Sequence, residues 1–172
     1  MFGLRIRPEK PADIPVITTI HQAAFQGEGE GRLVELLRKT GKAEISLVAE
    51  VSGQVIGHLL FSPVTIASAD HRLRGLGLAP VGVLPAYQKQ GAGTGMIQLG
   101  LKMANLRGYD TCVVLGDPAY YQRFGFQTAA LFGLENEYGA HEEFMALELR
   151  RGCLRGAAGL VQYAPEFNQL GV

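Results

Sequence analysis

The chain has 172 residues and a mass of 18.5 kDa, enough for one domain with its own hydrophobic core. Its 16 acidic and 16 basic residues balance, so the charge gives no sign of a general nucleic-acid binder or a polybasic membrane patch. With 47% hydrophobic residues, the chain is too apolar for a disordered protein.

The cysteines and the N-terminus exclude several further classes. Cys112 and Cys153 form neither a disulfide framework nor a zinc spacing. Residues 1–10 lack the apolar region of a signal peptide, and no apolar stretch approaches the ~18 residues of a membrane span. We therefore expect a cytoplasmic protein with a single domain over 1–172, no metal, no nucleic-acid partner and no membrane association.

The first part of the chain predicts two helices between strands. Asp13 is a predicted N-cap, and Gly41 a predicted helix stop. The pair Ser52–Gly53 between two β-rich runs predicts a hairpin turn. The predicted elements are a strand at 3–8, a helix over 14–25, a mobile acidic loop at 27–31, a helix at 32–41, and strands at 45–51 and 54–67.

The second part predicts a further helix among short strands. Its predicted elements are a polar connection at 70–75, a strand at 76–84, a helix over 93–107, a strand at 111–116, a helical turn at 117–125, and strands at 143–150 and 160–164. The helix over 93–107 is apolar on two sides, one of them marked by Leu99, Met103 and Leu106, so we expect it to be well buried. This order favours an α/β fold with a mixed (α+β) sheet over a doubly wound sheet.

The turn 88-QKQGAGTG-95 joins a strand to a helix and has the character of an anion site. It lacks the Lys-Ser or Lys-Thr pair of a Walker A loop, and Met96 stands where a dinucleotide fingerprint needs its third glycine. The spacing Q-x-x-G-x-G favours a nest of backbone N–H groups for a diphosphate, and a flexible helix entry is the structural alternative.

The preceding strand sharpens that interpretation. Pro85 removes a ladder donor, so strand pairing should end there. Unpaired backbone groups of residues 81–85 would then be open to an extended ligand arm that carries amides. A diphosphate at the turn and an amide-bearing arm along the strand together describe coenzyme A.

At this point the sequence resembles the GNAT superfamily of acyl-CoA N-acyltransferases, through 83-VLPAYQKQGAG-93 and 121-YQRFGF-126. The string 115-LGDPAYYQRFGF-126 is similar to the bacterial YhbS-like branch, as are 143-EFMALELRRG-152 and 161-VQYAPEF-167. The resemblance spans nearly the whole chain. It implies a single-domain GNAT fold, with helices flanking a mixed central sheet and a V-shaped opening between its two central strands.

The resemblance also implies a binding site for acetyl-CoA as co-substrate. The backbone of Val81, Gly82 and Val83 would bind the acyl carbonyl and the pantetheine arm. The diphosphate would lie on the loop residues Gln88, Lys89, Gln90, Gly91, Ala92 and Gly93. Lys89 would add a cation or stay a surface lysine. Ala92 stands where the family more often has isoleucine, with its side chain expected to point away from the phosphates.

Two residues of the second motif are further site candidates. Tyr121 lies where the family often has a general acid that protonates the departing CoA thiolate, and an aromatic packing role is the alternative. Asp117 is first a predicted helix N-cap and second a ligand contact. The neighbouring Tyr120 is expected to pack or to contact substrate.

The general base is left open. The strand 76–84 carries no carboxylate. The candidates are Glu30 and His58, with Glu28 and His71 as further ones, and a water relay is an equal alternative. Glu28 and Glu30 would alternatively attract a cationic amine.

The expected reaction is direct acetyl transfer from acetyl-CoA to a primary amine in a ternary complex. A non-catalytic CoA-binding module or sensor on the same fold is the main alternative, and a nucleotide-binding protein is the weaker one. The acceptor amine and the assembly are left open, with a homodimer as one alternative.

Overall fold

The computed structural model describes residues 3–68 and 72–170, and the chain divides into two compact units. Unit 1 comprises Met1–Phe61, Pro80–Gly100 and Pro165–Val172, and unit 2 comprises Ser62–Ala79 and Leu101–Ala164. Each unit is described by itself, and the single domain over the whole chain stays a prediction.

The sheet of unit 1 contains three strands that pair antiparallel in chain order. Strand β1 (Leu4–Pro8) pairs with β2 (Ile45–Val51), which pairs with the first part of β3 (Gln54–Ala67). The predicted hairpin is confirmed with the predicted bounds. Its turn residues Ser52 and Gly53 have φ of 50° and 78°, as a tight hairpin turn requires.

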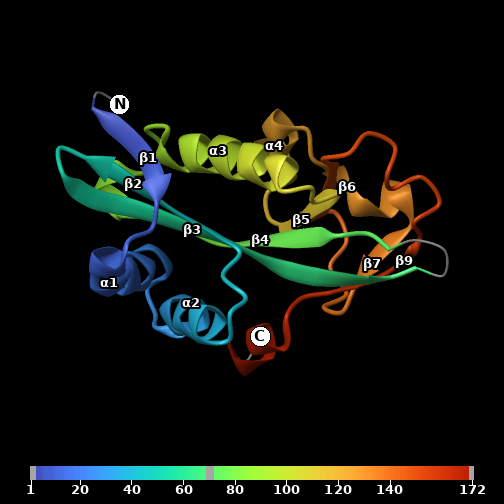
Figure 1. Cartoon of the computed structure of the whole chain (residues 1–172), viewed down its shortest axis with the longest axis horizontal. Coiled ribbons are helices and arrows are strands. Elements are labelled where there is room, and N and C mark those ends of the chain that lie inside the picture. The colour runs from blue at the N-terminus through green and yellow to red at the C-terminus, as the bar shows by residue number, and fades with distance from the viewer. Residues whose placement is uncertain (1–2, 69–71, 171–172) are drawn as a thin grey trace. The chain divides into compact units, whose positions relative to one another are not determined.

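Helices lie on both sides of these strands (Figure 1). Helices α1 (Ile14–Phe25) and α2 (Gly29–Lys39) lie on one side, and the first part of α3 (Ala92–Leu106) lies on the other. The apolar stripes of the first two helices supply much of the core of this unit, through Ile17, Ile20, Leu33, Val34 and Leu37.

One prediction in this region is wrong, and a second, Asp13 as the N-cap of α1, is confirmed in position only. The mobile loop at 27–31 is largely helical, because α2 already begins at Gly29. Gly31 is buried in this helix against α1, where a Cβ would make an ordinary van der Waals contact of 3.4 Å with Cγ2 of Thr18. Asp13 makes no side-chain cap to α1, because its carboxylate instead binds the guanidinium of Arg7 at 2.7 Å.

Helix α3 is buried on one side only. Met96, Ile97 and Ala104 are buried, and Gly100 lies so close to Phe61 that a Cβ would meet that ring at 2.3 Å. Leu106, the last residue of the helix, is 77% exposed. The expectation of burial on two sides is therefore wrong, because the side of Leu99, Met103 and Leu106 is only half-buried and reaches solvent at Leu106.

Unit 2 mixes parallel and antiparallel strand pairs. Strand β5 pairs in parallel with β4 and antiparallel with β8, which also pairs with β6. The last part of β3 pairs antiparallel with β9, which pairs in parallel with β7. The strands are β4 (Gly75–Val83), β5 (Thr111–Leu115), β6 (Gln127–Thr128), β7 (Leu134–Asn136), β8 (Phe144–Glu148) and β9 (Gly159–Gln162).

The mixed α/β fold class is thereby confirmed. Strands β6 and β7 were not predicted, since two or three residues are too few to show a period. The short helices are α4 (Pro118–Tyr121) and the 3-10 helices η1 (Pro11–Asp13), η2 (Pro85–Tyr87), η3 (Gln122–Phe124), η4 (Ala129–Phe132) and η5 (Pro165–Leu170).

The β4–β5 pairing is short. It runs from Gly75–Thr111 to Gly77–Val113, whereas β4 continues to Val83 and β5 to Leu115. Such an early end is what an opening between two central strands requires. The V-shaped opening itself stays a prediction.

Candidate active site

The glycine-rich turn follows β4 through a 3-10 turn in unit 1. The Leu84 N–H donates to Ile56 O at 2.9 Å, and Pro85, which has no N–H, then begins η2. The Gln88 side chain donates from Nε2 to Val83 O at 2.9 Å. This amide therefore ties the turn back to the end of the strand, which leaves the backbone of the turn to face a ligand.

The backbone of the turn has the shape of an anion nest. Lys89 and Gly91 have φ of 60° and 95°, both in the left-handed region. A Cβ at Gly91 would meet nothing within 4 Å among the described residues, so the turn borders open space. Ala92 is buried, and its side chain therefore points into the protein.

Helix α3 begins directly after these residues. Its first backbone hydrogen bond runs from Gly95 N–H to Gly91 O at 2.9 Å. Amides of a first helical turn have no acceptor within the helix, and they carry the positive end of the helix dipole. A turn with alternating positive φ before a helix N-terminus binds anionic oxygens.

The base candidate His58 lies wholly inside unit 1. Its ring is 0% exposed and forms hydrogen-bond contacts with His21 Nε2 and Ser46 Oγ, both at 2.8 Å. Sequence reasoning did not identify His21, which is also 0% exposed. A signal for it existed, because His21 lies four residues after Ile17 on the buried face of α1.

The two other base candidates that lie in unit 1 are in α2 or next to it. Glu30 is half-buried in the first turn of the helix. Glu28 is exposed at the N-cap and pairs with Arg32 four residues later. Within 3–68 and 72–170, no hydrogen bond joins Glu30 to His58. His71 lies outside the described residues.

Tyr121 lies at the end of α4 in unit 2. Its ring covers Gly116, where a Cβ would meet the ring at 2.3 Å, and it packs edge-on against Phe126. Burial raises the pKa of the Tyr121 phenol to about 12, so the hydroxyl is protonated at neutral pH. Asp117 caps α4, because its Oδ1 accepts from Ala119 N–H at 3.0 Å.

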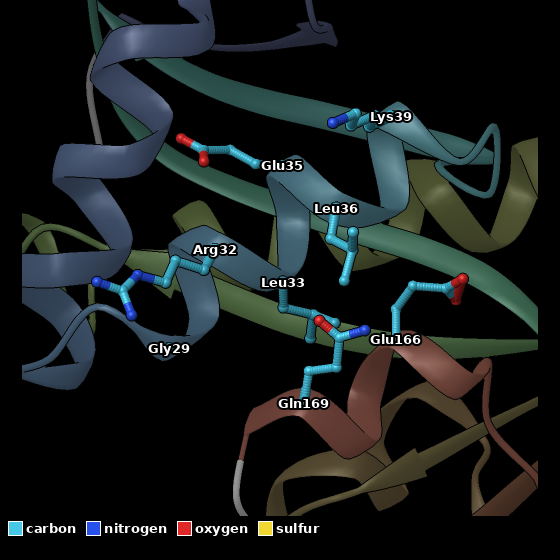
Figure 2. Close-up of a pocket in the computed structure, with 8 residues that line it drawn as sticks. All are labelled: Gly29, Arg32, Leu33, Glu35, Leu36, Lys39, Glu166 and Gln169. Carbon is cyan, nitrogen blue, oxygen red and sulfur yellow. The ribbon is translucent and has the colours of Figure 1, made fainter.

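A pocket of about 470 Å³ in unit 1 contains none of the predicted site residues. In Figure 2, Leu33 and Leu36 point from α2 toward η5, which contributes Glu166 and Gln169. Lys42 binds the Glu166 carboxylate at 2.6 Å. These contacts hold α2 and the segment that follows it, which contains Lys42, against η5.

The described residues contain neither a cluster of metal ligands nor a helix that could span a membrane. Nowhere in 3–68 and 72–170 do three His, Cys, Asp or Glu side chains come together as metal ligands would. In the same ranges, each helix is too short or too polar to cross a bilayer.

Comparisons with known proteins agree on one family. The model of the acetyltransferase (GNAT) domain matches residues 5–129. The uncharacterized N-acetyltransferase YhbS of Escherichia coli K12 is 39% identical over 166 residues, which are 95% of this chain and 98% of the relative. YjhQ of the same organism, also an uncharacterized N-acetyltransferase, is 35% identical over 69% of this chain and 67% of its own length.

Two crystal structures resemble the whole chain. That of Escherichia coli YhbS in complex with CoA has a TM-score of 0.90 at 38% identity and covers 98% of this chain and 93% of its own. That of a GNAT acetyltransferase from Brucella melitensis in complex with acetyl-CoA has a TM-score of 0.80 at 36% identity and covers 97% of this chain and 99% of its own.

Proposed function

The chain belongs to the GNAT acetyltransferase family, and we propose that it transfers an acetyl group from acetyl-CoA to a primary amine in a ternary complex. The observation that carries the proposal is the turn before α3, with its positive φ at Lys89 and Gly91 and the open space at Gly91. The CoA and acetyl-CoA complexes of the two similar structures support the same ligand here.

The donor would bind through backbone groups of unit 1. The amides of Gln88 to Gly93 would hold the diphosphate, and glycine at 91 keeps a Cβ away from the phosphate oxygens. Lys89 would add an exposed cation. The backbone of Val81 to Val83 would bind the pantetheine arm and the acyl carbonyl. An extended strand can pair its N–H and C=O groups with an extended arm that carries amides, as in strand addition.

Tyr121 would act as the general acid. A neutral phenol donates a proton to a leaving thiolate, and burial keeps the Tyr121 phenol neutral over the physiological range. The acceptor amine must lose a proton as it attacks, and β4 carries no carboxylate to take it. Glu30 and His58 stay the base candidates of this proposal, which also keeps a cytoplasmic location and leaves the homodimer open.

The proposal is tested by binding and turnover measured on the same preparation. Calorimetry with CoA and acetyl-CoA, with ATP as the competing ligand, measures donor recognition. Mass spectrometry then detects acetyl transfer from acetyl-CoA to a library of amines and to a cell extract. Acetylation of at least one amine is the expected result.

The other results separate the alternatives. Tight CoA binding without transfer to any amine would favour a non-catalytic CoA-binding module. The lack of a carboxylate on β4 is the observation that suggests this alternative. No binding of either CoA form at millimolar concentration would reject the proposal. Preference for ATP would revive a nucleotide-binding protein.

A further inference from the structure

A continuous path of hydrogen-bonded side chains runs through unit 1 from α1 to the end of β1. His21 Nε2 lies 2.8 Å from His58 Nδ1, and His58 Nε2 lies 2.8 Å from Ser46 Oγ. Ser46 Oγ donates to Glu9 Oε1 at 3.0 Å. The path therefore joins side chains of α1, β3 and β2 to the residue that follows β1.

The Glu9 carboxylate determines which group donates and which accepts in each hydrogen bond of the path. Glu9 accepts from Arg38 as well as from Ser46, and a carboxylate paired in this way only accepts. The Ser46 hydroxyl therefore accepts from His58 Nε2–H. His58 Nδ1 must then accept from His21 Nε2–H, because a neutral imidazole has one donor and one acceptor nitrogen. His21 Nδ1 is left with a bare lone pair.

That lone pair has no partner among the described residues. His21 is 0% exposed, and its Nδ1 atom is buried without a hydrogen bond. An unsatisfied buried polar atom costs about 1–3 kcal/mol, so native proteins rarely retain one without use. Burial lowers the pKa of His21 to about 4, which keeps the ring neutral and the lone pair unprotonated at neutral pH.

The lone pair faces the strand that the proposed donor occupies. A Cβ built on Gly82 would lie 2.7 Å from His21 Nδ1, so this atom lies directly over Gly82. Gly82 is the middle residue of Val81–Val83, which would hold the acyl end of acetyl-CoA. Phe25, itself 41% exposed, stacks on the His21 ring at a centroid distance of 5.9 Å and covers one of its faces.

We propose that His21 accepts the proton of the acceptor amine and that His58 and Ser46 pass a proton on to Glu9. This inference rests on the proposed acetyl transfer. The amine nitrogen forms a bond to the thioester carbonyl carbon, and its N–H proton moves to His21 Nδ1. In the same step His21 Nε2–H moves to His58 Nδ1, His58 Nε2–H to Ser46 Oγ, and the Ser46 hydroxyl proton to Glu9.

The remaining bonds balance. The C–S bond breaks, and the CoA thiolate takes a proton from Tyr121. Each imidazole gains one proton and loses another, so no buried imidazolium forms. Imidazolium would be unfavourable here, because the His58 ring is buried and lies near Arg38 and His21, although Asp13 and Glu9 are acids nearby. After the products leave, the protons return along the same path, and the proton released from His21 Nδ1 passes through solvent to the Tyr121 phenolate, which restores the starting state.

Nitrogen-15 NMR of the two rings tests the path without any substrate. We expect an Nε2–H tautomer with bare Nδ1 for both His21 and His58 at pH 7. An Nδ1–H tautomer of His21 would overturn the inference whatever the activity of the enzyme.

Kinetics of variants then test the relay in the working enzyme. His21→Gln and Ser46→Ala should each lower kcat, His21→Gln by about 10²–10⁴-fold, the usual contribution of a general base. Their affinity for CoA should stay that of the wild type, and Ser46→Thr, which keeps the hydroxyl, should recover most of the rate. His141→Gln makes the same chemical change at an exposed histidine of unit 2 and serves as the control.

The outcomes separate the two proposals. Wild-type rates in both His21→Gln and Ser46→Ala, in an enzyme that acetylates an amine, would overturn the relay and leave the acetyl transfer standing. Absence of transfer in the wild type would reject the proposed function, and the relay with it. Loss of kcat with unchanged thermal unfolding separates proton transfer from a structural role.

Discussion

The ring of His21 in α1 occupies the space that a Cβ at Gly82 of β4 would need. That Cβ would lie 2.7 Å from Nδ1 and 3.0 Å from Cε1 of the histidine ring. Contacts below 3.0 Å do not occur at real Cβ atoms. Position 82 must therefore be glycine as long as His21 keeps its place beside His58. This contact couples the strand of the proposed donor site to the buried histidines.

Gly82→Ala should consequently displace His21 and break its hydrogen bond to His58. We expect a loss of about 1–3 kcal/mol in the free energy of unfolding, as for other overpacked cores. Urea denaturation measures it. Gly95→Ala is the matched control, because a Cβ at Gly95 makes only ordinary contacts with Ile6, and alanine favours a helix. Equal stability of both variants would contradict the close contact.

Acid should destabilise the protein through His21. Burial lowers the pKa of His21 from 6.5 to about 4, so the unfolded chain binds a proton that the folded protein excludes. His21 makes its full contribution to the free energy of unfolding above pH 6.5. As the pH falls from 6.5 toward 4, the protein loses up to ~3 kcal/mol of that free energy.

Urea unfolding at pH 7 and pH 5 measures this effect in the wild type and in His21→Gln. The variant should lose less stability between the two pH values. It keeps the contribution of His58, whose pKa burial also lowers, so some dependence stays. An identical pH dependence in both proteins would show that His21 is not neutral by burial.

Tyr121→Phe should lower kcat by about 10²-fold or more, since it removes the proton donor of the proposed reaction. Calorimetry should find the affinity for acetyl-CoA nearly unchanged, because the ring that packs on Phe126 is kept. Tyr120→Phe, one residue away, is the control. Because the pKa of the Tyr121 phenol is about 12, ionisation of this phenol should not lower the kcat of the wild type below about pH 10. A wild-type rate in Tyr121→Phe would leave Tyr121 with packing alone.

Gly91→Ala should weaken CoA binding more than its backbone strain explains. The φ of 95° at Gly91 disfavours alanine by about 1–2 kcal/mol, although the new Cβ would meet nothing within 4 Å among the residues that the structure describes. Gly139→Ala introduces similar strain at φ 68°, also in open space, far along the sequence from the turn. Both should lose similar stability, and only Gly91→Ala should raise the Kd for CoA at least tenfold. Equal Kd values would place the diphosphate elsewhere.

Much of the local structure was predictable because it depends on neighbours in sequence. The hairpin of β2 and β3 follows from β-branched runs around Ser52–Gly53, and the cap of α4 follows from Asp117 before Pro118. The loop predicted at 27–31 is wrong because residues 29–31 already belong to α2. Gly31 is buried beside Thr18 of α1, and periodicity carries no information about such a contact.

The chain by itself determined the family motifs, the turn from Gln88 to Gly93 and the tyrosine at 121, because each is a short run whose spacing carries its chemistry. Only the tertiary structure decided that His58 has His21 on one side and Ser46 on the other, with Glu9 beyond. Those residues lie on α1, β3, β2 and the segment after β1, and only packing of the helix on the sheet brings them together. The sequence does not show the hydrogen-bond partners of a buried histidine, and these partners determine which of its ring nitrogens carries the proton.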